Sequence, residues 1–147
     1  IGASVTGRIT DLDVLPGQDV KRGQLLATLH SAELSTAQLA FLKAHSQRLL
    51  AMRGAQRAEQ LFEADVIGKA ELQRRQSEYS QAEAEVSAAR DQLMVLGMSE
   101  GAILALSSER NVNSQAAVRS SITGTVLDRK VTQGQVVQPA DTMFIVI

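Results

Sequence analysis

The chain has 147 residues and an almost balanced charge, with 15 lysines and arginines against 16 acidic side chains and a formal net charge of −1. This balance gives no electrostatic reason to expect a nucleic-acid partner, and aromatic residues, at 3% of the chain, are too few for a base-stacking surface. The absence of cysteine excludes disulfides, thiolate zinc sites and cysteine nucleophiles. No apolar run reaches the roughly 18 residues that cross a bilayer. The chain starts without methionine or a signal sequence, and both ends fall on strand-like sequence, so we expect it to be part of a longer protein.

An internal repeat relates the two ends of the chain. Residues 5–20, VTGRITDLDVLPGQDV, match residues 122–137, ITGTVLDRKVTQGQVV, without a gap. Each copy carries β-branched residues typical of strands and a turn with a glycine, Gly17 or Gly134, that tolerates a positive φ. Neither copy is long enough to bury a core alone. We therefore predict that the two copies pack on each other as one β domain.

The repeat also predicts the core of this domain and its points of close contact. Gly7 and Gly124 fall inside strands, where glycine marks a bulge or a close backbone approach. One set of β-branched residues per copy is expected to lie on a half-buried sheet, namely Val5, Ile9 and Val14 in the first copy and Ile122, Val126 and Val131 in the second. Most of the β core is predicted to consist of Val5, Ile9, Val14, Val20, Leu26, Val126, Val131, Val137 and Phe144.

Residues 32–97 form an insertion between the copies, with no proline and almost no strand signal. Heptad spacing over nearly four heptads predicts a coiled-coil seam in the second half, at Leu72, Arg75, Tyr79, Ala82, Val86, Ala89, Leu93 and Leu96. The first half shows the same spacing, with Arg48 as the exception, at Leu34, Ala37, Phe41, Ala44, Ala51, Ala55, Ala58 and Phe62. Residues 65–69 are the only turn-like stretch between them. We predict an antiparallel helical hairpin whose arms reach roughly 45 Å.

Capping residues mark the ends of these helices. Ser31 or Ser35 is suited to begin the first helix, and Gly97 to end the second. Ser99 is suited to cap a further short helix over residues 100–106.

The predicted domains follow from these boundaries. Residues 1–31 and 112–147 form the β domain, 32–97 the helical hairpin, and 98–111 a return linker with the short helix. The polar stretch 107–117 is expected to be irregular.

This organisation resembles the periplasmic adaptor (membrane fusion) proteins of tripartite efflux pumps. The stretches VTGRITDLDVLPGQDVKRGQLLATLHSAEL and VRSSITGTVLDRKVTQGQVVQPADTMFIV are similar to the two half-motifs of the family's lipoyl-like domain, and the resemblance covers essentially the whole chain. It implies an α+β fold, a split lipoyl/biotinyl-like β-sandwich with an inserted long antiparallel α-helical coiled-coil hairpin. Family members also have a β-barrel and a membrane-proximal domain, both absent from this chain. The phrase LMVLGMSEGAI is most similar to members of the heavy-metal resistance-nodulation-division type.

By this resemblance the protein is an adaptor and not an enzyme. It would lie in the periplasm of a Gram-negative bacterium, associated with the inner membrane, and assemble as a homo-oligomeric ring. Its partners would be an inner-membrane efflux transporter and an outer-membrane channel, with heavy-metal cations as the exported cargo.

The resemblance also places the channel contact at the hairpin tip. Drug-pump members often carry an arginine, a leucine four residues later and a serine seven residues after the leucine. Arg57 and Leu61 fit this spacing, but the third position is Gly68, so the contact that a serine would make is in doubt. Arg57, Leu61, Gly68 and Lys69 are the predicted partner-binding residues.

Two groups of alternatives remain. An adaptor of a multidrug pump or of an ATP-driven exporter has the same architecture. A lipoyl or biotinyl carrier domain of an enzyme complex needs a modifiable lysine at the turn between its halves, and residues 29–33 contain none. Lys21 and Lys130 lie in or near other turns and lack a supporting motif.

No residue pattern predicts catalysis, a cofactor or a metal site. There is no phosphate-binding loop, serine elbow or convergent set of His, Asp and Glu. His30 and His45 are far apart, and Met94 and Met98 are better explained by packing than by metal binding. A solvated face, or salt bridges between hairpins in a ring, would explain the charged residues of the hairpin: Glu59, Glu63, Glu71, Glu78, Glu83 and Glu85 with Arg53, Arg57, Arg74, Arg75 and Arg90.

Overall fold

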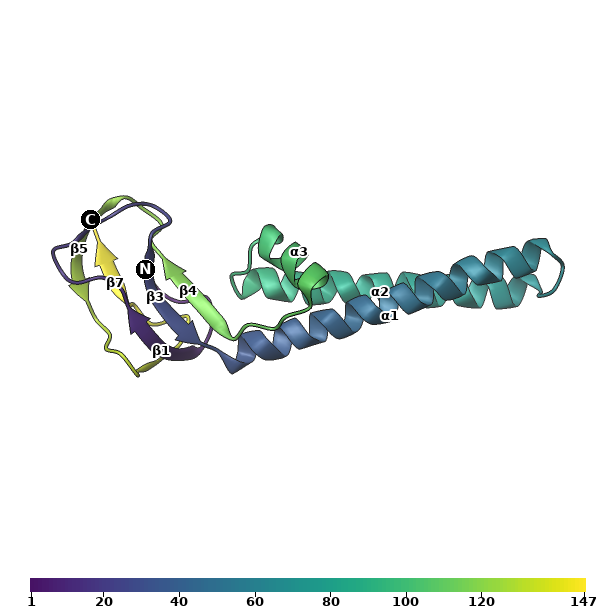
Figure 1. The fold of residues 1–147 in the computed structure, drawn as a ribbon, viewed down its shortest axis with the longest axis horizontal. Coiled ribbons are helices and arrows are strands. Elements are labelled where there is room, and N and C mark those ends of the chain that lie inside the picture. Colours follow the sequence, from purple (N-terminus) through teal and green to yellow (C-terminus); the bar gives the residue numbers. More distant parts are fainter. The chain divides into compact units, whose positions relative to one another are not determined.

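The structure, a computed structural model, describes residues 1–147 as an α+β chain with two compact units (Figure 1). The first unit holds residues 1–36, 95–97 and 112–147, and the second holds 37–94 and 98–111. The strands are β1 (Gly7–Leu12), β2 (Asp19–Val20), β3 (Leu25–His30), β4 (Gln115–Arg119), β5 (Gly124–Arg129), β6 (Val136–Val137) and β7 (Phe144–Val146). The helices are α1 (Ala32–Glu63), α2 (Lys69–Val95) and α3 (Glu100–Glu109). None of the three helices is both long and apolar enough to cross a membrane.

The β unit consists of two antiparallel sheets in which the repeat copies exchange strands. One sheet has the order β4-β3-β1-β6 and the other β2-β5-β7. The short strand of the first copy, β2, pairs with β5 of the second, and the short strand of the second copy, β6, pairs with β1 of the first. Each copy therefore completes a sheet of the other, and both copies lie in the first compact unit.

The predicted β core is confirmed. All nine predicted core residues are at most 3% exposed: Val5, Ile9, Val14, Val20, Leu26, Val126, Val131, Val137 and Phe144. Ile122 corrects the prediction, because its side chain is 45% exposed. Ile122 lies in the bend before β5, where its carbonyl oxygen accepts a hydrogen bond of 2.6 Å from the Ser120 hydroxyl. The bend turns it away from the face that the strand residues share.

The repeated glycines serve two different needs. Gly17 and Gly134 have φ values of 90° and 86°, as predicted for their turns. Gly7 and Gly124 lie against neighbouring backbone. A Cβ on Gly7 would lie 2.7 Å from the carbonyl oxygen of His30, and one on Gly124 would overlap the carbonyl oxygen of Ile147.

In the second unit, α1 and α2 run side by side and are joined by a turn over residues 64–68 (Figure 1). Between residues 73 and 97, α2 and the residues after it are sheltered from solvent only at the predicted seam positions Arg75, Tyr79, Ala82, Val86, Ala89, Leu93 and Leu96, with Met98 following. The predicted positions on α1 are likewise buried or half-buried, except Phe62, which is 38% exposed. Phe62 lies in the last turn of α1, beside the exposed turn that joins the two helices.

Helix α3 begins as predicted, with the Ser99 side chain accepting a hydrogen bond from the Ala102 backbone N–H. It continues beyond Leu106 to Glu109, and β4 begins at Gln115, so the prediction of an irregular stretch over 107–117 was wrong at both ends. Strand β4 is polar and alanine-rich, and its place comes from pairing with β3, which local sequence does not reveal.

Candidate functional site

The turn between α1 and α2 is closed by backbone hydrogen bonds and one left-handed residue. The Val66 N–H donates to the Leu61 carbonyl oxygen at 2.8 Å, and the Leu72 N–H donates to that of Gly68 at 3.3 Å. Asp65 has φ 58°, a conformation that aspartate tolerates better than most residues. Gly68 has no positive φ, and a Cβ there would meet nothing within 4 Å. The turn therefore does not require glycine at position 68.

The four predicted tip residues divide into two groups. Arg57 and Leu61 lie one turn apart on α1 and line an open groove of about 570 Å³ to which both helices contribute residues. Gly68 and Lys69 are exposed at the turn and do not line it. The neighbouring turn residue Ile67 does. The complete lining is Gln47, Leu50, Ala51, Arg53, Gly54, Arg57, Ala58, Leu61, Ile67, Glu71, Arg75 and Glu78.

Most residues of this groove are not among those predicted from the sequence. On α1, the lining includes Gln47, Leu50, Gly54, Arg57 and Leu61, which follow one another at intervals of three or four residues. Residues at this spacing lie on one face of a helix. Extending the helical face backwards from Leu61 would have found them from the sequence.

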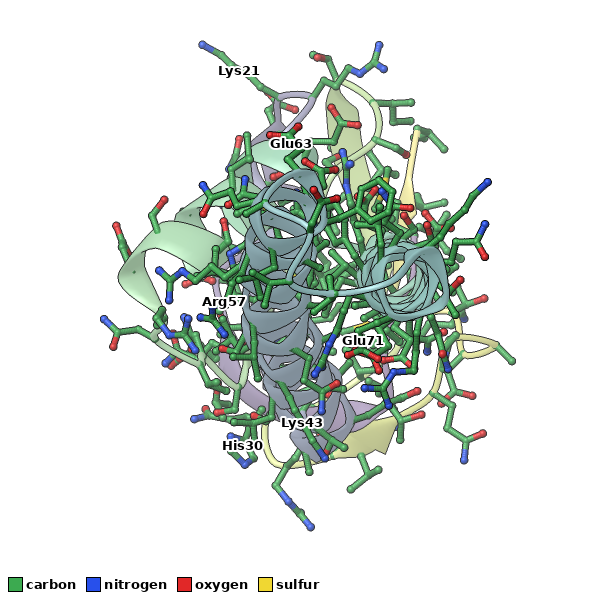
Figure 2. All side chains as sticks on the ribbon, turned by 90° about the vertical axis from the view of Figure 1, so that its right-hand side faces the viewer. Lys21, His30, Lys43, Arg57, Glu63 and Glu71 are labelled. Carbon is green, nitrogen blue, oxygen red and sulfur yellow. The ribbon has the colours of Figure 1, made fainter.

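The charged residues that α2 contributes to the groove form ion pairs, whereas Arg57 of α1 does not. Glu71 accepts hydrogen bonds from Arg74 at 2.8 Å and from Arg75 at 3.2 Å, and Arg75 also reaches Glu78 at 3.3 Å. The hydrogen bond from Arg74, followed by the charges of Arg74 and Arg75, lowers the pKa of Glu71, although desolvation opposes the shift. Arg57 makes no ion pair or hydrogen bond within the chain. Figure 2 shows its side chain on the side of α1 that faces away from α2, whereas Glu71 lies on α2.

Arg48, the exception in the seam of α1, lies near Tyr79 of α2. The Tyr79 hydroxyl of α2 interacts with both Arg48 and Glu83. The hydrogen bond to Glu83, together with desolvation, raises the pKa of Tyr79, and Arg48 opposes this rise. Arg48 is half-buried, so it adds a second arginine to a seam that already contains Arg75 of α2.

Gly54 lies in the interior of α1, and a Cβ there would meet nothing within 4 Å. Glycine in a helix interior destabilises it by about 0.5–1 kcal/mol relative to alanine. We therefore expect Gly54→Ala to raise the free energy of unfolding by about 0.5–1 kcal/mol, measured by denaturant titration. Gly97→Ala is the matched control, and we expect it to destabilise the protein because Gly97 has φ 97° and its Cβ would lie 2.7 Å from the Ser4 hydroxyl oxygen. A loss of stability with Gly54→Ala would contradict the open helix surface.

The residues considered for metal binding make other contacts. No group of three or more His, Cys, Asp or Glu side chains is placed to hold a metal ion. His30 Nδ1 lies 2.8 Å from the Ser114 hydroxyl, and the His45 ring stacks on Phe41 with centroids 6.1 Å apart. The Met98 sulfur accepts a hydrogen bond of 3.5 Å from the Gln38 amide.

Comparison with known proteins assigns the chain to a family. Its entire length, residues 1–147, matches the family model described as the CzcB-like barrel-sandwich hybrid domain. The chain belongs to this family. No curated protein matches the CzcB-like chain.

Solved structures agree with the family assignment. ZneB from Cupriavidus metallidurans is 27% identical with a TM-score of 0.75, over 99% of this chain and 58% of ZneB. A MacA-MexA chimeric protein with the Pseudomonas aeruginosa MexA α-hairpin domain is 29% identical with a TM-score of 0.59, over 99% of this chain and 43% of the chimera. A putative efflux transporter from Bacteroides eggerthii shares the fold, at 19% identity and a TM-score of 0.60, over 98% of this chain and 37% of that protein.

These matches confirm the predicted resemblance to membrane fusion proteins of the heavy-metal type. The CzcB-like chain covers between 37% and 58% of these three solved proteins.

Proposed function

We propose that the protein is the periplasmic adaptor subunit of a tripartite efflux pump that exports heavy-metal cations. In this role it bridges an inner-membrane transporter to an outer-membrane channel and takes no part in covalent chemistry. The observation that carries the proposal is the match of the whole chain to the CzcB-like family, supported by the likeness to ZneB at a TM-score of 0.75. The full-length protein would be exported to the periplasm, be held at the inner membrane and assemble as a ring.

In the proposed adaptor, α1 and α2 form the coiled-coil hairpin and their turn contacts the channel. The sheltered residues of α2 follow the heptad spacing that a coiled coil requires. Arg57, Leu61, Gly68 and Lys69 are the proposed contact residues. Leu61 and Arg57 would supply an apolar and a cationic contact from the groove, and Gly68 and Lys69 would meet the partner at the exposed turn.

A second candidate is an adaptor of a multidrug pump or of an ATP-driven exporter. The 29% identity with the MacA-MexA chimera favours keeping it, because that protein shares this chain's architecture over 99% of the chain. Glycine at position 68, where drug-pump members often have serine, speaks for the metal-exporting adaptor.

A cysteine at the turn tests the proposed channel contact. The protein has no cysteine, so Gly68→Cys in the full-length protein can be labelled at one site with a short photo-cross-linker in intact cells. We expect the cross-linker to capture an outer-membrane channel, and the pump that co-purifies then separates metal export from drug export. Position 68 tolerates the change, because a Cβ there meets nothing within 4 Å.

The matched control is Glu109→Cys, at an exposed position at the end of α3. It should capture no channel. Capture of the channel equally from both positions, or of only further copies of the protein from position 68, would refute the proposed tip.

A further inference from the structure

The segment before β1 is bonded to the start of α1. The Thr6 carbonyl oxygen accepts a hydrogen bond of 2.8 Å from the Ser31 hydroxyl, and the Thr6 N–H donates to a Glu33 carboxylate oxygen at 3.3 Å. The Ser31 hydroxyl oxygen in turn accepts a hydrogen bond of 3.2 Å from the Leu34 N–H, as an N-cap does. Both polar backbone groups of one residue are thus bonded to the beginning of a long helix.

The end of α2 meets the same segment two residues earlier. Gly97, which follows α2, has φ 97°. A Cβ there would lie 2.7 Å from the Ser4 hydroxyl oxygen and 2.8 Å from the Ser4 Cβ. The Ser4 side chain therefore fills the space that a side chain at position 97 would need. We call Ser4, Val5 and Thr6 the clasp, because they contact the end of α2 on one side and the start of α1 on the other.

The second repeat copy has the matching segment without these helix contacts. Val5 of the clasp is 1% exposed, whereas Ile122 at the matching position is 45% exposed. Around Ile122 the hydrogen bonds stay within the β unit: the Arg22 N–H donates to the Thr123 hydroxyl oxygen at 3.0 Å, and the Ser120 hydroxyl donates to the Ile122 carbonyl oxygen at 2.6 Å. The repeat itself therefore does not require contacts to helices, and the clasp is a feature of the first copy.

The chain on either side of the clasp is fixed in the β unit. The Ile1 nitrogen donates to the Phe144 carbonyl oxygen at 2.8 Å, and the Ile1 carbonyl oxygen accepts from the Met143 N–H at 2.9 Å. After the clasp, Gly7 begins β1 and lies against the His30 carbonyl oxygen. A short segment that is fixed at both ends has little freedom to follow a moving helix, so its contacts hold the helix ends in place.

We propose that the clasp positions the helices, by holding the start of α1 and the end of α2 at the β unit. Thr6, Ser31 and Glu33 are its positioning residues. Helix α1 is uninterrupted from Ala32 to Glu63, so whatever directs its first turn also directs the residues beyond it. The inference deepens the proposed function and rests on it for one consequence, namely that the clasp decides where the proposed contact residues are presented to a partner.

The start of α3 offers a comparison in which capping occurs without a clasp. Ser99 caps α3 by accepting a hydrogen bond of 3.1 Å from the Ala102 N–H, and Glu100 pairs with Arg90 of α2 at 3.1 Å. A serine and a nearby glutamate thus begin both helices, but the pair at α1 is bonded to Thr6. Removing each pair separates the loss of a helix cap from the loss of the clasp.

Spin labels test whether the clasp holds the start of α1. In the full-length protein, Lys21→Cys and Thr36→Cys place labels at exposed positions before β3 and near the start of α1. The length of β3 separates them by roughly 20 Å, within reach of pulsed electron paramagnetic resonance. We expect a single narrow distance distribution. Ser31→Ala with Glu33→Leu removes both side-chain partners of Thr6 and should roughly double the width of this distribution.

The matched control is Ser99→Ala with Glu100→Leu in the same labelled protein. It removes a cap and an acid from the start of α3 and leaves the clasp untouched, so the distribution between positions 21 and 36 should stay narrow. Equal widening in the clasp variant and the control would mean that the loss of any helix cap loosens the protein. That result, or an unchanged width in the folded clasp variant, would overturn the proposal.

A double-mutant cycle tests the other side of the clasp and decides the question if the clasp variant does not fold. Gly97→Ala should lower the ratio of folded to unfolded protein, because its Cβ would overlap Ser4. In a Ser4→Gly background both atoms that this Cβ would meet are absent, so the reduction should be roughly tenfold smaller. The φ of Gly97 leaves the same residual strain in both backgrounds. Equal reductions would show that the end of α2 does not rest on the clasp, and the proposal would be wrong.

These measurements need no partner and can fail separately from the channel cross-linking. Channel capture from position 68 without an effect of the clasp variants would refute only the clasp. An effect of the clasp variants without channel capture would refute only the proposed contact of the turn.

Discussion

Replacing Gly124 with alanine should destabilise the β unit by about 3 kcal/mol or more, because the new methyl group has no space in the native sheet. Its Cβ would overlap the Ile147 carbonyl oxygen and lie 2.8 Å from the carbonyl carbon. That oxygen also accepts the hydrogen bond of 2.8 Å from the Thr125 N–H, so relieving the overlap would break the pairing at this end of β5. The free energy of unfolding from a denaturant titration, followed by circular dichroism, measures the effect.

Gly134→Ala is the matched control in the same repeat copy. Gly134 has φ 86°, and a Cβ there would meet nothing within 4 Å. Its replacement should cost only about 1–2 kcal/mol, the usual strain of an L-residue in the left-handed region. If both variants lose the same amount, the close approach at Gly124 is not the reason for its glycine.

The repeat made the β unit predictable to a large extent. Two copies of one pattern, each too short for a core, must pack together, and this fixed the core residues before the sheet order was known. Which strands pair in the two sheets could not be predicted in the same way. The exchange of β2 and β6 between sheets depends on contacts between distant residues, and β4 lacks the apolar alternation that would mark it as a strand.

A left-handed backbone conformation was predictable only at positions where a glycine indicates it. Gly17, Gly134 and Gly97 all have the positive φ that glycine tolerates best. The left-handed residue of the turn between α1 and α2 is Asp65, although Gly68 lies in the same turn. The backbone at position 68 thus does not require glycine.

The turn between α1 and α2 was predictable in its location, whereas the groove beside it was not predicted. The turn lies at the turn-like stretch 65–69 that the sequence indicated, and Arg57 and Leu61 share a groove. The contribution of α2 to the groove depends on how the two helices align, and helical spacing within α1 alone does not determine it. The contact of the tip with a channel stays a prediction until it is tested by cross-linking.

A last prediction tests whether an apolar residue of α2 stabilises the protein because it lies at a seam position of the heptad or merely because it is apolar. Leu93 and Val95 are both apolar and lie two residues apart on α2, but Leu93 is completely buried and Val95 is 72% exposed. Leu93→Ala should lower the free energy of unfolding by about 3 kcal/mol, from lost burial and the cavity left behind. Val95→Ala should change it by less than about 0.5 kcal/mol. Similar losses in both variants, measured by denaturant titration of the helix signal, would mean that the seam does not follow the heptad. A small loss at Leu93 would instead mean that neighbouring side chains close the cavity, and then the helix pair would not be rigidly packed at this position.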